Sequence, residues 1–573
     1  MKEHYQKKFS TDLSKSILTT LIRYFPPKKF NVVLIDVVNI LIDGISRGDI
    51  YIDIRQPSIS FDLQHKGWPK NHIKALLASG WTEGANSPIV FINNKISWRR
   101  THNEINTTIN KILLRKNHVN TQSKQFKVEI KYKVSDHLNF QQNKAVELVD
   151  SEKIILLSGG PGTGKTSTIL QMLLKALTTN PYLDIAMAAP TGKAAKKLKD
   201  TFLVGLKNLE IPLKDKLSKV PCKTLHKLLE AGPNGFKRNS QHLLKLDLIV
   251  IDEMSMVDLT LFNGLLDSLP KSCQIILVGD PDQLLPVGSG GIWQILQSEE
   301  MNKVFHLNSV RLTKSYRNKG DIALLRNTLK YEGLDAFWRL LSIKKHSSNV
   351  TQHISPSKSI PDFIKKTLFD YRNNLKIFTK KCITSISKEA WKSSMIEITP
   401  SPEILELFRL IDSLLILCPQ TNGPWGVRQI NQYLLGENFE SRDKDWDQGT
   451  PIMARSNQPD IGIANGDVGI VIGHGENRRF LFNVFSGEQK LVTRLINPSR
   501  LNMFDAAFAM TIHKSQGSEA NQVLLLWPDT SKISKDNNFQ RTYTNDYEKR
   551  MIYTAITRAK KQLLVITNKE EDF

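Results

Sequence analysis

The chain has 573 residues, of which 40% are hydrophobic and 24% are charged, a composition that is typical of a globular protein and excludes one disordered throughout. Lysine and arginine total 79 against 56 aspartate and glutamate, so the net charge of +23 favours a polyanionic partner such as nucleic acid, although a Lys-, Asn- and Ile-rich composition also raises it. The four cysteines are dispersed, no apolar run approaches the ~20 residues that span a bilayer, and the N-terminus is charged. We therefore expect a cytoplasmic protein of about three or four domains, without a disulfide framework, zinc site, membrane segment or secretory leader.

The N-terminal part of the chain has two amphipathic helical patterns. Apolar residues recur at i, i+3 and i+4 in Ser10–Phe25 and Phe30–Ile45, and residues 1–115 contain no catalytic motif. A polar, basic stretch over residues 115–124 is typical of a linker. We therefore predict a mostly helical first domain at residues 1–115.

Short apolar runs alternate with longer helical patterns from about residue 135 onwards, as in βα units on a parallel sheet that is buried on both faces. The runs are Ile154–Leu157, Ile185–Ala188, Leu248–Ile251 and Ile275–Val278 in a first group, and Leu414–Leu417, Val523–Trp527 and Gln562–Thr567 in a second. Within the second group, Pro451–Val471 and Arg479–Val492 read as short strands with Gly and Asn turns, which predicts a small β insertion. The predicted fold class is α/β with two parallel-sheet units, and residues 320–400 show no clear pattern.

A glycine-rich loop joins the first strand to a helical pattern at Ser167–Leu177. It has the spacing G-x-x-x-x-G-K-[ST] and consists of Gly159, Gly160, Pro161, Gly162, Thr163, Gly164, Lys165 and Thr166. Glycines let several backbone N–H groups point at one phosphate, and the helix N-terminus adds partial positive charge. Lys165 would reach the β- and γ-phosphates, and the Thr166 hydroxyl would bind Mg²⁺. The loop therefore predicts a nucleotide site with ATP and Mg²⁺ as cofactors.

Two further strand ends predict the rest of a hydrolytic site. Asp252 and Glu253 follow the strand Leu248–Ile251, and the carboxyl ends of parallel strands meet at one edge of a sheet. Asp252 would hold the Mg²⁺ shell, and Glu253 would position the attacking water or accept its proton. Gln283 follows the strand Ile275–Val278 and could sense the γ-phosphate with a neutral amide, although its Pro- and Asp-rich surroundings equally fit a turn.

These residues belong to an ordered series of motifs that spans about 420 residues. In chain order the series is Gln142–Ala145, Gly159–Thr166, Ala189–Ala195, Thr224–His226, Asp252–Met256, Gly279–Pro286, Ser315–Arg317, Met510–Glu519 and Tyr553–Lys560. The series resembles the superfamily 1 DNA helicases. The residues within these motifs, together with Asn465–Gly469, are similar to those of the RecD helicase family. That family is the alpha subunit of exodeoxyribonuclease V and belongs to the 5′→3′ branch. Met254 stands where that family more often has a small residue, a departure that concerns packing rather than chemistry.

The resemblance implies a fold and further residue roles. The implied fold has two RecA-like P-loop domains at residues 116–314 and 315–573, with a small SH3-like β insertion at about 446–500. Gln142 would read the adenine edge, and Arg317 and Arg558 would reach the γ-phosphate from the second domain. An arginine supplied across a cleft stabilises transition-state charge only when the cleft is closed, so hydrolysis would be coupled to domain closure and to movement along DNA.

The resemblance also implies contacts with a DNA strand. Short polar side chains can hold phosphates without reading sequence, and aromatic rings can add base stacking. The candidates for phosphate contacts are Thr191, Thr224, His226, Thr511, His513 and Ser515. The candidates for stacking, among which the sequence does not choose, are Tyr316, Trp425 and Phe504.

The implied partners are single-stranded and unwinding double-stranded DNA, a RecB-like helicase–nuclease chain and a RecC-like scaffold chain, with residues 1–115 as the docking domain of the heterotrimer. We expect no nuclease site in this chain. A metal nuclease needs clustered carboxylates near a lysine, and the partial matches Glu129–Lys131 and Glu488–Lys490 fit solvent-facing charges better. Two alternatives stay open: a stand-alone 5′→3′ helicase of the same branch, and a slow P-loop module that only clamps DNA.

Overall fold

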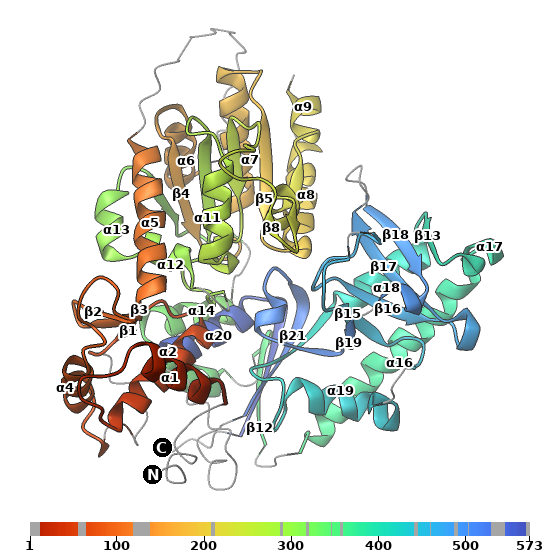
Figure 1. Ribbon diagram of the computed structural model, residues 1–573. Coiled ribbons are helices and arrows are strands. Elements are labelled where there is room, and N and C mark those ends of the chain that lie inside the picture. Colours follow the sequence, from red (N-terminus) through yellow and green to blue (C-terminus); the bar gives the residue numbers. More distant parts are fainter. Residues whose placement is uncertain are drawn as a thin grey trace.

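The structure is a computed structural model with an N-terminal domain, two parallel-sheet domains and an antiparallel sheet (Figure 1). It describes residues 12–55, 63, 65–117, 138–207, 213–286, 290–316, 320–344, 347–355, 359–440, 445–458, 460–485, 491–501, 503–528 and 545–568. No helix in these ranges has both the length and the apolar character that a bilayer crossing requires.

The N-terminal domain combines helices with a small antiparallel sheet of strand order β1-β3-β2. Its elements are α1 (Asp12–Tyr24), α2 (Val33–Arg47), β1 (Ile52–Asp53), α4 (Lys70–Ser79), β2 (Ile89–Ile92) and β3 (Lys95–Trp98). The two predicted helices are confirmed as α1 and α2. Their apolar faces pack with α4 around the buried Leu34, Leu76 and Trp81, so this domain has a core of its own.

Helix α5 (Arg99–Lys116) ties the N-terminal domain to the first parallel-sheet domain. Ile112 is buried in the core of that domain. The Arg115 guanidinium donates to the carbonyl oxygens of Leu266, Leu269 and Pro270 at 2.6–2.7 Å. The predicted linker at residues 115–124 is therefore wrong at its start, because Arg115 lies in the last turn of a packed helix. Residues 118–137, with Glu129–Lys131, lie outside the described residues.

The first large sheet has six parallel strands in the order β11-β4-β10-β9-β5-β6. Its strands are β4 (Ile154–Gly159), β5 (Ile185–Ala189), β6 (Cys222–Thr224), β9 (Leu248–Ile251), β10 (Gln274–Gly279) and β11 (Ser309–Leu312). Around it lie α6 (Phe140–Ser151), α7 (Lys165–Thr179), α8 (Gly192–Lys207), α9 (Lys214–Ser218), α10 (Leu225–Leu228), η2 (Met254–Met256), α11 (Leu259–Ser268), α12 (Ile292–Leu296), α13 (Glu299–Val304) and the hairpin β7 (Ala231–Gly232) and β8 (Gly235–Phe236). Ile154 and Leu156 of β4 share a core with α11, whereas Ile155 and Leu157 share one with α7. Burial on both faces explains why this strand is a continuous apolar run, and the predicted parallel sheet is confirmed.

The second large sheet has five parallel strands in the order β12-β22-β21-β14-β20. They are β12 (Val350–Ile354), β14 (Leu414–Cys418), β20 (Ala509–Thr511), β21 (Ala520–Trp527) and β22 (Ala559–Thr567). One face is covered by α14 (Asp321–Tyr331), α15 (Leu334–Ile343) and α20 (Asn545–Ile556), and the other by α16 (Asp362–Thr384), α18 (Pro402–Ile411) and α19 (Val427–Leu435). The predicted second α/β unit is confirmed, and helices fill much of the stretch at residues 320–400 that shows no clear sequence pattern.

An antiparallel sheet of strand order β13-β18-β17-β16-β15-β19 extends from this domain (Figure 1). Its strands are β13 (Met395–Ile398), β15 (Pro451–Ala454), β16 (Val468–Ile472), β17 (Arg479–Phe485), β18 (Leu491–Ile496) and β19 (Phe504–Ala506); short helices are α17 (Lys388–Lys392), η3 (Gly436–Glu440), η4 (Gly475–Asn477), η5 (Pro498–Arg500) and η6 (His513–Ser515). The predicted β insertion is confirmed, but its SH3-like form is not. Strands β13 and β19 from outside the expected range extend it to six strands, which share a core with α16 and α18. Residues 486–490, with Glu488–Lys490, lie outside the described residues.

Candidate nucleotide-binding site

The glycine-rich loop lies between β4 and α7, at the carboxyl end of the first sheet. Gly162 and Gly164 have φ values of 75° and 85°, in the left-handed region that favours glycine. Lys165 Nζ donates to the carbonyl oxygens of Gly159 at 2.7 Å and Gly160 at 3.2 Å. An ammonium group and the N-terminus of α7 therefore meet at this loop, which is the arrangement that binds phosphate.

Asp252 and Glu253 follow β9, which is separated from β4 by β10 alone. Asp252 Oδ1 accepts the Glu253 N–H at 2.9 Å, and Glu253 has a left-handed φ of 54° although it carries a side chain. Such a backbone conformation costs about 1–3 kcal/mol and persists where the surroundings enforce it. Burial and the neighbouring Glu253 carboxylate raise the pKa of Asp252, whereas the Lys165 ammonium opposes that shift. The structure thus brings Asp252 within electrostatic reach of Lys165 in the phosphate loop, with Glu253 beside it.

The segment after β10 carries the third predicted polar group. Gln283 is 3% exposed, and its Nε2 donates to Asp280 Oδ2 at 3.2 Å. A Cβ atom at Gly160 would lie 4.0 Å from the same Asp280 oxygen. Burial raises the pKa of Asp280, and Lys165 opposes the shift. Gln283 is therefore connected to the phosphate loop through Asp280, to which sequence reasoning assigned no role.

Helix α20 of the second parallel-sheet domain holds the same segment from the other side. Its hydrogen bonds run from Tyr553 Oη to Asp280 Oδ2 (3.2 Å), from Leu284 N to Thr554 Oγ1 (2.9 Å), and from Arg550 Nη1 to the carbonyl oxygens of Pro281 (2.9 Å) and Gln283 (3.2 Å). Leu284 is fully buried in the core of the second domain. The phosphate loop therefore lies at the junction of the two parallel-sheet domains.

Gln142 and Tyr316 lie together on another flank of the loop. Gln142 forms a capping box with Asn139 at the start of α6, and a Cβ atom at Gly164 would lie 2.6 Å from its Nε2. Tyr316 N donates to Gly162 O at 2.8 Å, and the Tyr316 hydroxyl accepts from Asn139 Nδ2 at 2.9 Å. About half of the Tyr316 surface is exposed. An amide and an accessible ring thus stand side by side next to the phosphate loop.

Of the two arginines predicted to reach the γ-phosphate, the structure describes Arg558 but not Arg317. Arg317 lies outside the described residues, directly after Tyr316. Arg558 is 2% exposed, and its guanidinium donates to Thr554 O at 3.0 Å and to Ser518 O at 3.2 Å within its own domain. None of the Arg558 hydrogen bonds found among the described residues reaches the first domain.

A second contact between the domains joins α8 to the segment before β21. Lys197 Nζ and Glu519 Oε1 form an ion pair at 2.5 Å, and Lys560 Nζ lies 3.8 Å from Glu519 Oε2. Burial lowers the pKa of Lys197, whereas the charges of Glu519 and Glu253 oppose the shift. Lys197 follows the motif Ala189–Ala195, and Glu519 ends the motif Met510–Glu519. The sequence did not predict their ion pair, because only the fold brings the two residues together.

Part of the predicted DNA-contacting set lies along the line where the domains face each other. Thr224 ends β6 beside Ala189 at the end of β5, and Thr191 follows two residues later. A Cβ atom at Gly517 of the second domain would lie 3.7 Å from Thr191 Oγ1. His226 is exposed next to Thr224. The structure therefore brings Thr191 near the segment of the second domain that contains Gly517.

Other members of that set are engaged within the protein. Ser515 is fully buried and donates its hydroxyl to Ile512 O at 2.7 Å, so it offers no surface to a strand in this arrangement. His513 Nε2 lies 3.1 Å from Tyr547 Oη. Of the aromatic stacking candidates, Trp425 and Phe504 are 1% and 7% exposed, and Tyr316 stands at the phosphate loop. Base stacking by Trp425 or Phe504 is therefore wrong for this structure.

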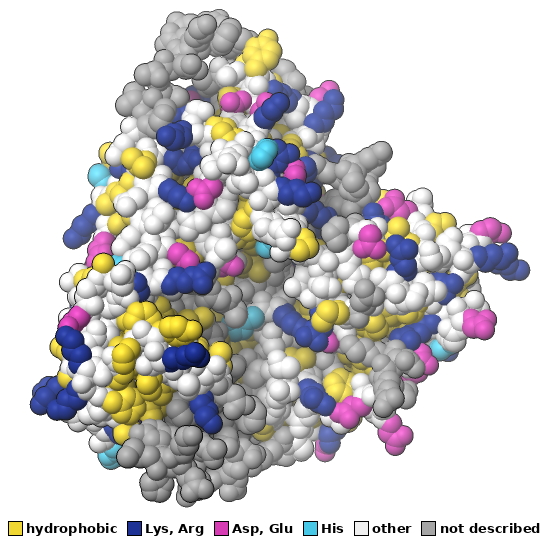
Figure 2. Space-filling view, in the orientation of Figure 1, with side chains coloured by type: hydrophobic (Ala, Val, Ile, Leu, Met, Phe, Trp, Pro, Cys, Tyr) yellow, Lys and Arg dark blue, Asp and Glu magenta, His cyan; other side chains and the backbone are white. Residues whose placement is uncertain are grey.

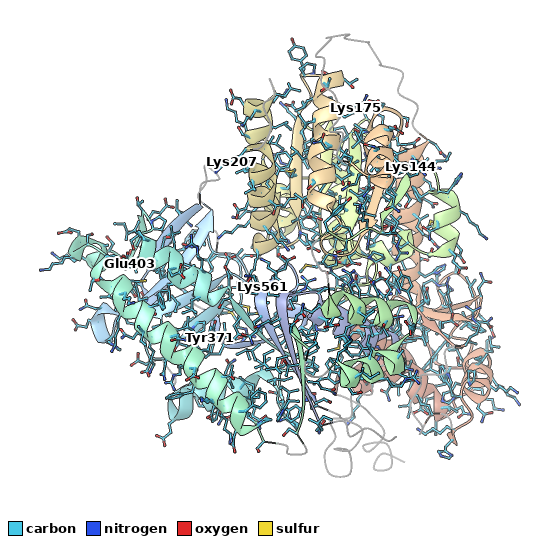
Figure 3. All side chains as sticks on the ribbon, turned by 180° about the vertical axis from the view of Figure 1, so that it is seen from behind. Lys144, Lys175, Lys207, Tyr371, Glu403 and Lys561 are labelled. Atoms are coloured by element: carbon cyan, nitrogen blue, oxygen red, sulfur yellow. The ribbon has the colours of Figure 1, made fainter. Side chains whose placement is uncertain are left out.

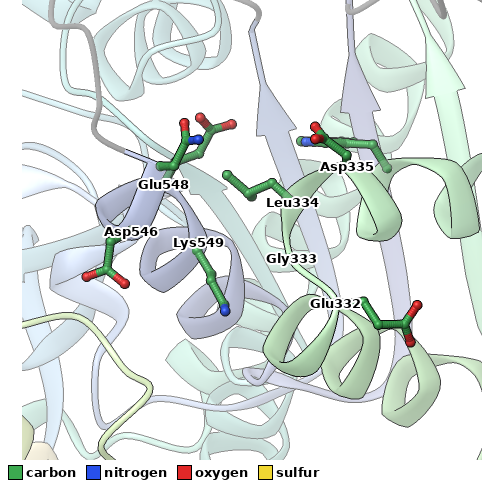
Figure 4. A pocket seen from close by; sticks show the side chains of 9 residues that line it. Glu332, Gly333, Leu334, Asp335, Asp546, Glu548 and Lys549 are labelled. Atoms are coloured by element: carbon green, nitrogen blue, oxygen red, sulfur yellow. The ribbon is translucent and has the colours of Figure 1, made fainter. Parts of the chain in front are cut away.

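A cavity of about 410 Å³ lies between the turn that joins α14 to α15 and the start of α20 (Figure 4). Its charged lining consists of Glu332, Asp335, Asp546, Glu548 and Lys549. Four carboxylates against one ammonium disfavour a phosphate ligand. This cavity is therefore not a second nucleotide site.

Comparisons with known proteins place the chain among helicases. A model of an AAA domain matches residues 142–289, and a model of a UvrD-like helicase C-terminal domain matches residues 506–566. A RecBCD enzyme subunit RecD of Mycolicibacterium smegmatis is 30% identical over 439 residues, which cover 74% of this chain and 70% of that protein. The chain belongs to the RecD family.

Further relatives extend the comparison. The RecD subunit of Buchnera aphidicola subsp. Acyrthosiphon pisum is 28% identical over 540 residues, covering 88% of this chain and 84% of that protein. A solved structure of Bacteroides Pif1 bound to ssDNA has 17% identity and a TM-score of 0.40, and the match covers 75% of this chain and 92% of that one. The RecD resemblance predicted from the motifs is confirmed, and the two matched segments contain the residues that meet at the interdomain junction.

Proposed function

We propose that this chain is the 5′→3′ motor subunit of a RecBCD-type helicase–nuclease, which processes double-strand DNA breaks for recombinational repair in the cytoplasm. The chain is an ATP-dependent DNA helicase of the RecD family. The observation that carries the proposal is the position of the phosphate loop against the segment that α20 holds. A nucleotide at that junction would touch both domains, so its hydrolysis would change how they are held together.

ATP would be held by the loop from Gly159 to Thr166. We assign Lys165 to the β- and γ-phosphates, Thr166 and Asp252 to Mg²⁺, and Glu253 to the attacking water. The donor set fits the metal, because hydroxyl and carboxylate oxygens are ligands that Mg²⁺ prefers, and the raised pKa of Asp252 marks a carboxylate that a cation would stabilise. Mg²⁺, when bound, supplies charge neutralisation on the phosphate oxygens.

The base of the nucleotide would lie on the flank formed by Gln142 and Tyr316. Gln142 offers an amide to the adenine edge, and the half-exposed Tyr316 ring offers a face for stacking. Tyr316 is hydrogen-bonded to Gly162 and the Gln142 amide lies next to Gly164, which supports their assignment to the same ligand.

The two arginines would complete the site when the domains close. We assign Arg317 to the γ-phosphate because it directly follows Tyr316 in the chain, and the Tyr316 backbone is hydrogen-bonded to the phosphate loop. Arg558 would have to leave the carbonyl oxygens of Thr554 and Ser518. That exchange would link transition-state stabilisation to closure.

The DNA strand would run along the line where the two domains face each other, held by Thr191, Thr224, His226, Thr511 and His513, with Ser515 accessible only after rearrangement. Contacts of this kind hold phosphates without reading bases, and with the net charge of +23 they would make affinity fall steeply with salt.

The N-terminal domain would dock on partner chains of RecB and RecC type. Apolar side chains gather on its surface over α1 and α2 (Figure 2). Those with substantial exposure are Leu13, Ile22 and Tyr24 of α1, Phe25, Phe30 and Val32 between the two helices, and Ile45 of α2. Contiguous exposed apolar surface of this sort marks interaction sites. We keep the division into residues 1–115, 116–314 and 315–573 as a proposal, with α5 serving as the rigid link between docking domain and motor.

The direct test is ATP hydrolysis with and without single-stranded DNA. Lys165→Gln should abolish DNA-stimulated turnover in a folded protein, since it removes the charge on the transferring phosphate. Lys175→Gln, on the same helix but paired with Asp150, is the matched control and should retain turnover (Figure 3). Turnover in Lys165→Gln above about a tenth of the wild-type value would contradict the proposal.

A further inference from the structure

Tyr553 places a buried hydroxyl against the phosphate loop, and the assigned roles leave it unused. The residue is 3% exposed on α20, and a Cβ atom at Gly160 would lie 3.0 Å from its Oη. Burial and the Asp280 charge raise the pKa of Tyr553 well above its usual value. The hydroxyl therefore stays protonated and remains a hydrogen-bond donor.

Asp280 is the acceptor at which hydrogen bonds from both domains converge. Its Oδ1 accepts from Asp282 N at 3.1 Å, and its Oδ2 accepts from Gln283 Nε2 and from Tyr553 Oη, each at 3.2 Å. A carboxylate accepts only, so it obliges the Gln283 amide to present its NH₂ group to Asp280. The first domain supplies Asp280 and Gln283, whereas the second supplies Tyr553.

The remaining end of the Gln283 amide is a buried acceptor. Gln283 Oε1 has no hydrogen-bond partner among the described residues. A buried acceptor without a donor is unfavourable, and it gains most from a ligand that can donate. A γ-phosphate oxygen is itself an acceptor, whereas the attacking water can donate a hydrogen.

We propose that Tyr553 and Asp280 are positioning residues that orient Gln283, so that its free Oε1 accepts a hydrogen from the attacking water. The pair forms only when the two domains are together, because its members come from different domains. Any DNA contact that holds the domains together thereby raises turnover. The inference rests on the proposed ATPase function, and it changes the task of Gln283 from sensing the phosphate to orienting the nucleophile.

The test is the kcat and KM of the full-length chain for ATP with saturating single-stranded DNA. Tyr553→Phe removes one oxygen and keeps the ring, so kcat should fall by at least about tenfold while KM stays within about twofold. Tyr371→Phe is the matched control, because this buried hydroxyl on α16 donates to Ile411 O at 3.4 Å, far from the loop (Figure 3). A wild-type kcat in Tyr553→Phe would overturn the inference.

Two further variants keep the test decisive. Asp280→Asn leaves one acceptor oxygen where the carboxylate has two, so an NH₂ group must face either Asp282 N or the donors Gln283 and Tyr553, and the network is broken. The same loss of kcat is expected, and this variant replaces Tyr553→Phe if that protein does not fold. If Tyr553 acts through Gln283, the double variant Tyr553→Phe, Gln283→Ala should be no slower than Gln283→Ala alone. Multiplicative losses would place the effect of Tyr553 elsewhere and overturn the inference. Lys165→Gln separates the two levels: retained turnover there refutes the ATPase site itself, whereas its loss beside an unaffected Tyr553→Phe refutes only the positioning role.

Discussion

Glu253 has a strained backbone conformation and is the residue that we assign to the attacking water. Its left-handed φ follows directly on the buried end of β9, next to Asp252, which lies within electrostatic reach of Lys165. Strained residues of this kind concentrate at functional sites, since folding alone gains nothing from them. The strain therefore agrees with an assignment of Glu253 to the attacking water.

Glu253→Gln should bind ATP as the wild type does and lose turnover by at least about 100-fold, because an amide cannot accept the proton of the attacking water. Binding is measured with a fluorescent ATP analogue, and turnover by phosphate release. Parallel losses of affinity and turnover would instead make Glu253 a residue that shapes the loop.

Asp252→Asn should stabilise the nucleotide-free protein in a pH-dependent way. The raised pKa of Asp252 means that the folded state prefers the protonated carboxyl group, so wild-type stability falls as the pH rises from about 4 through the raised value. The asparagine of the variant has no proton to lose and gains no charge over this range. Its advantage in Tm over the wild type should be small at pH 4 and larger at pH 7, and an equal difference at both values would contradict the raised pKa that burial and the Glu253 carboxylate give Asp252.

The spacing of the glycine-rich loop predicted Lys165, and a strand end predicted Asp252 and Glu253. For Gln283 the local sequence fitted a turn equally well, and only the surrounding series of motifs favoured a site. The bond between Tyr553 and Asp280 was beyond such reasoning, because the two residues are 273 positions apart and meet only through the packing of α20. The burial of Ser515 was likewise not predictable, because it depends on the short helix η6, in which the Ser515 hydroxyl donates to Ile512 O.

At the scale of elements, central strands were predictable and edge strands were not. Strand β9 matches its predicted run residue for residue, because burial on both faces demands four apolar residues in succession. The edge strand β6 has only three residues, Cys222–Thr224, none of them buried. Helix α16 buries Ile364, Leu368, Tyr371 and Leu375 at helical spacing, but dense lysines and asparagines conceal that stripe in the sequence.

Helix α5 offers a quantitative test of how the docking domain is attached. Arg115→Ala should lower the free energy of unfolding by about 3 kcal/mol, because it leaves three carbonyl oxygens at the end of α11 without their charged donor. Arg100→Ala, on the exposed side of the same helix, should change it by less than about 0.5 kcal/mol. Urea unfolding of both variants measures the difference, and similar losses would show that α5 is not anchored through Arg115.

At the scale of the whole molecule, two domains share the proposed nucleotide site and a third presents apolar surface. Tyr24→Glu places a charge on the exposed α1 surface and should prevent co-purification with the RecB- and RecC-type chains while leaving DNA-stimulated ATPase activity intact. Tyr182→Glu is the control, since Tyr182 is equally exposed but lies on the first parallel-sheet domain. Unchanged assembly of Tyr24→Glu, or equal effects of both changes, would place the docking surface elsewhere.

The direction of movement follows from how the whole motor holds its strand, and unwinding polarity tests it most directly. The measurement is strand displacement by the full-length chain, with ATP and Mg²⁺, on partial duplexes that carry either a 5′ or a 3′ single-stranded tail, with Lys165→Gln as the inactive control. We predict displacement from the 5′-tailed duplex, little from the 3′-tailed one and none by the variant. A requirement for a 3′ tail, or displacement that survives Lys165→Gln, would contradict the account.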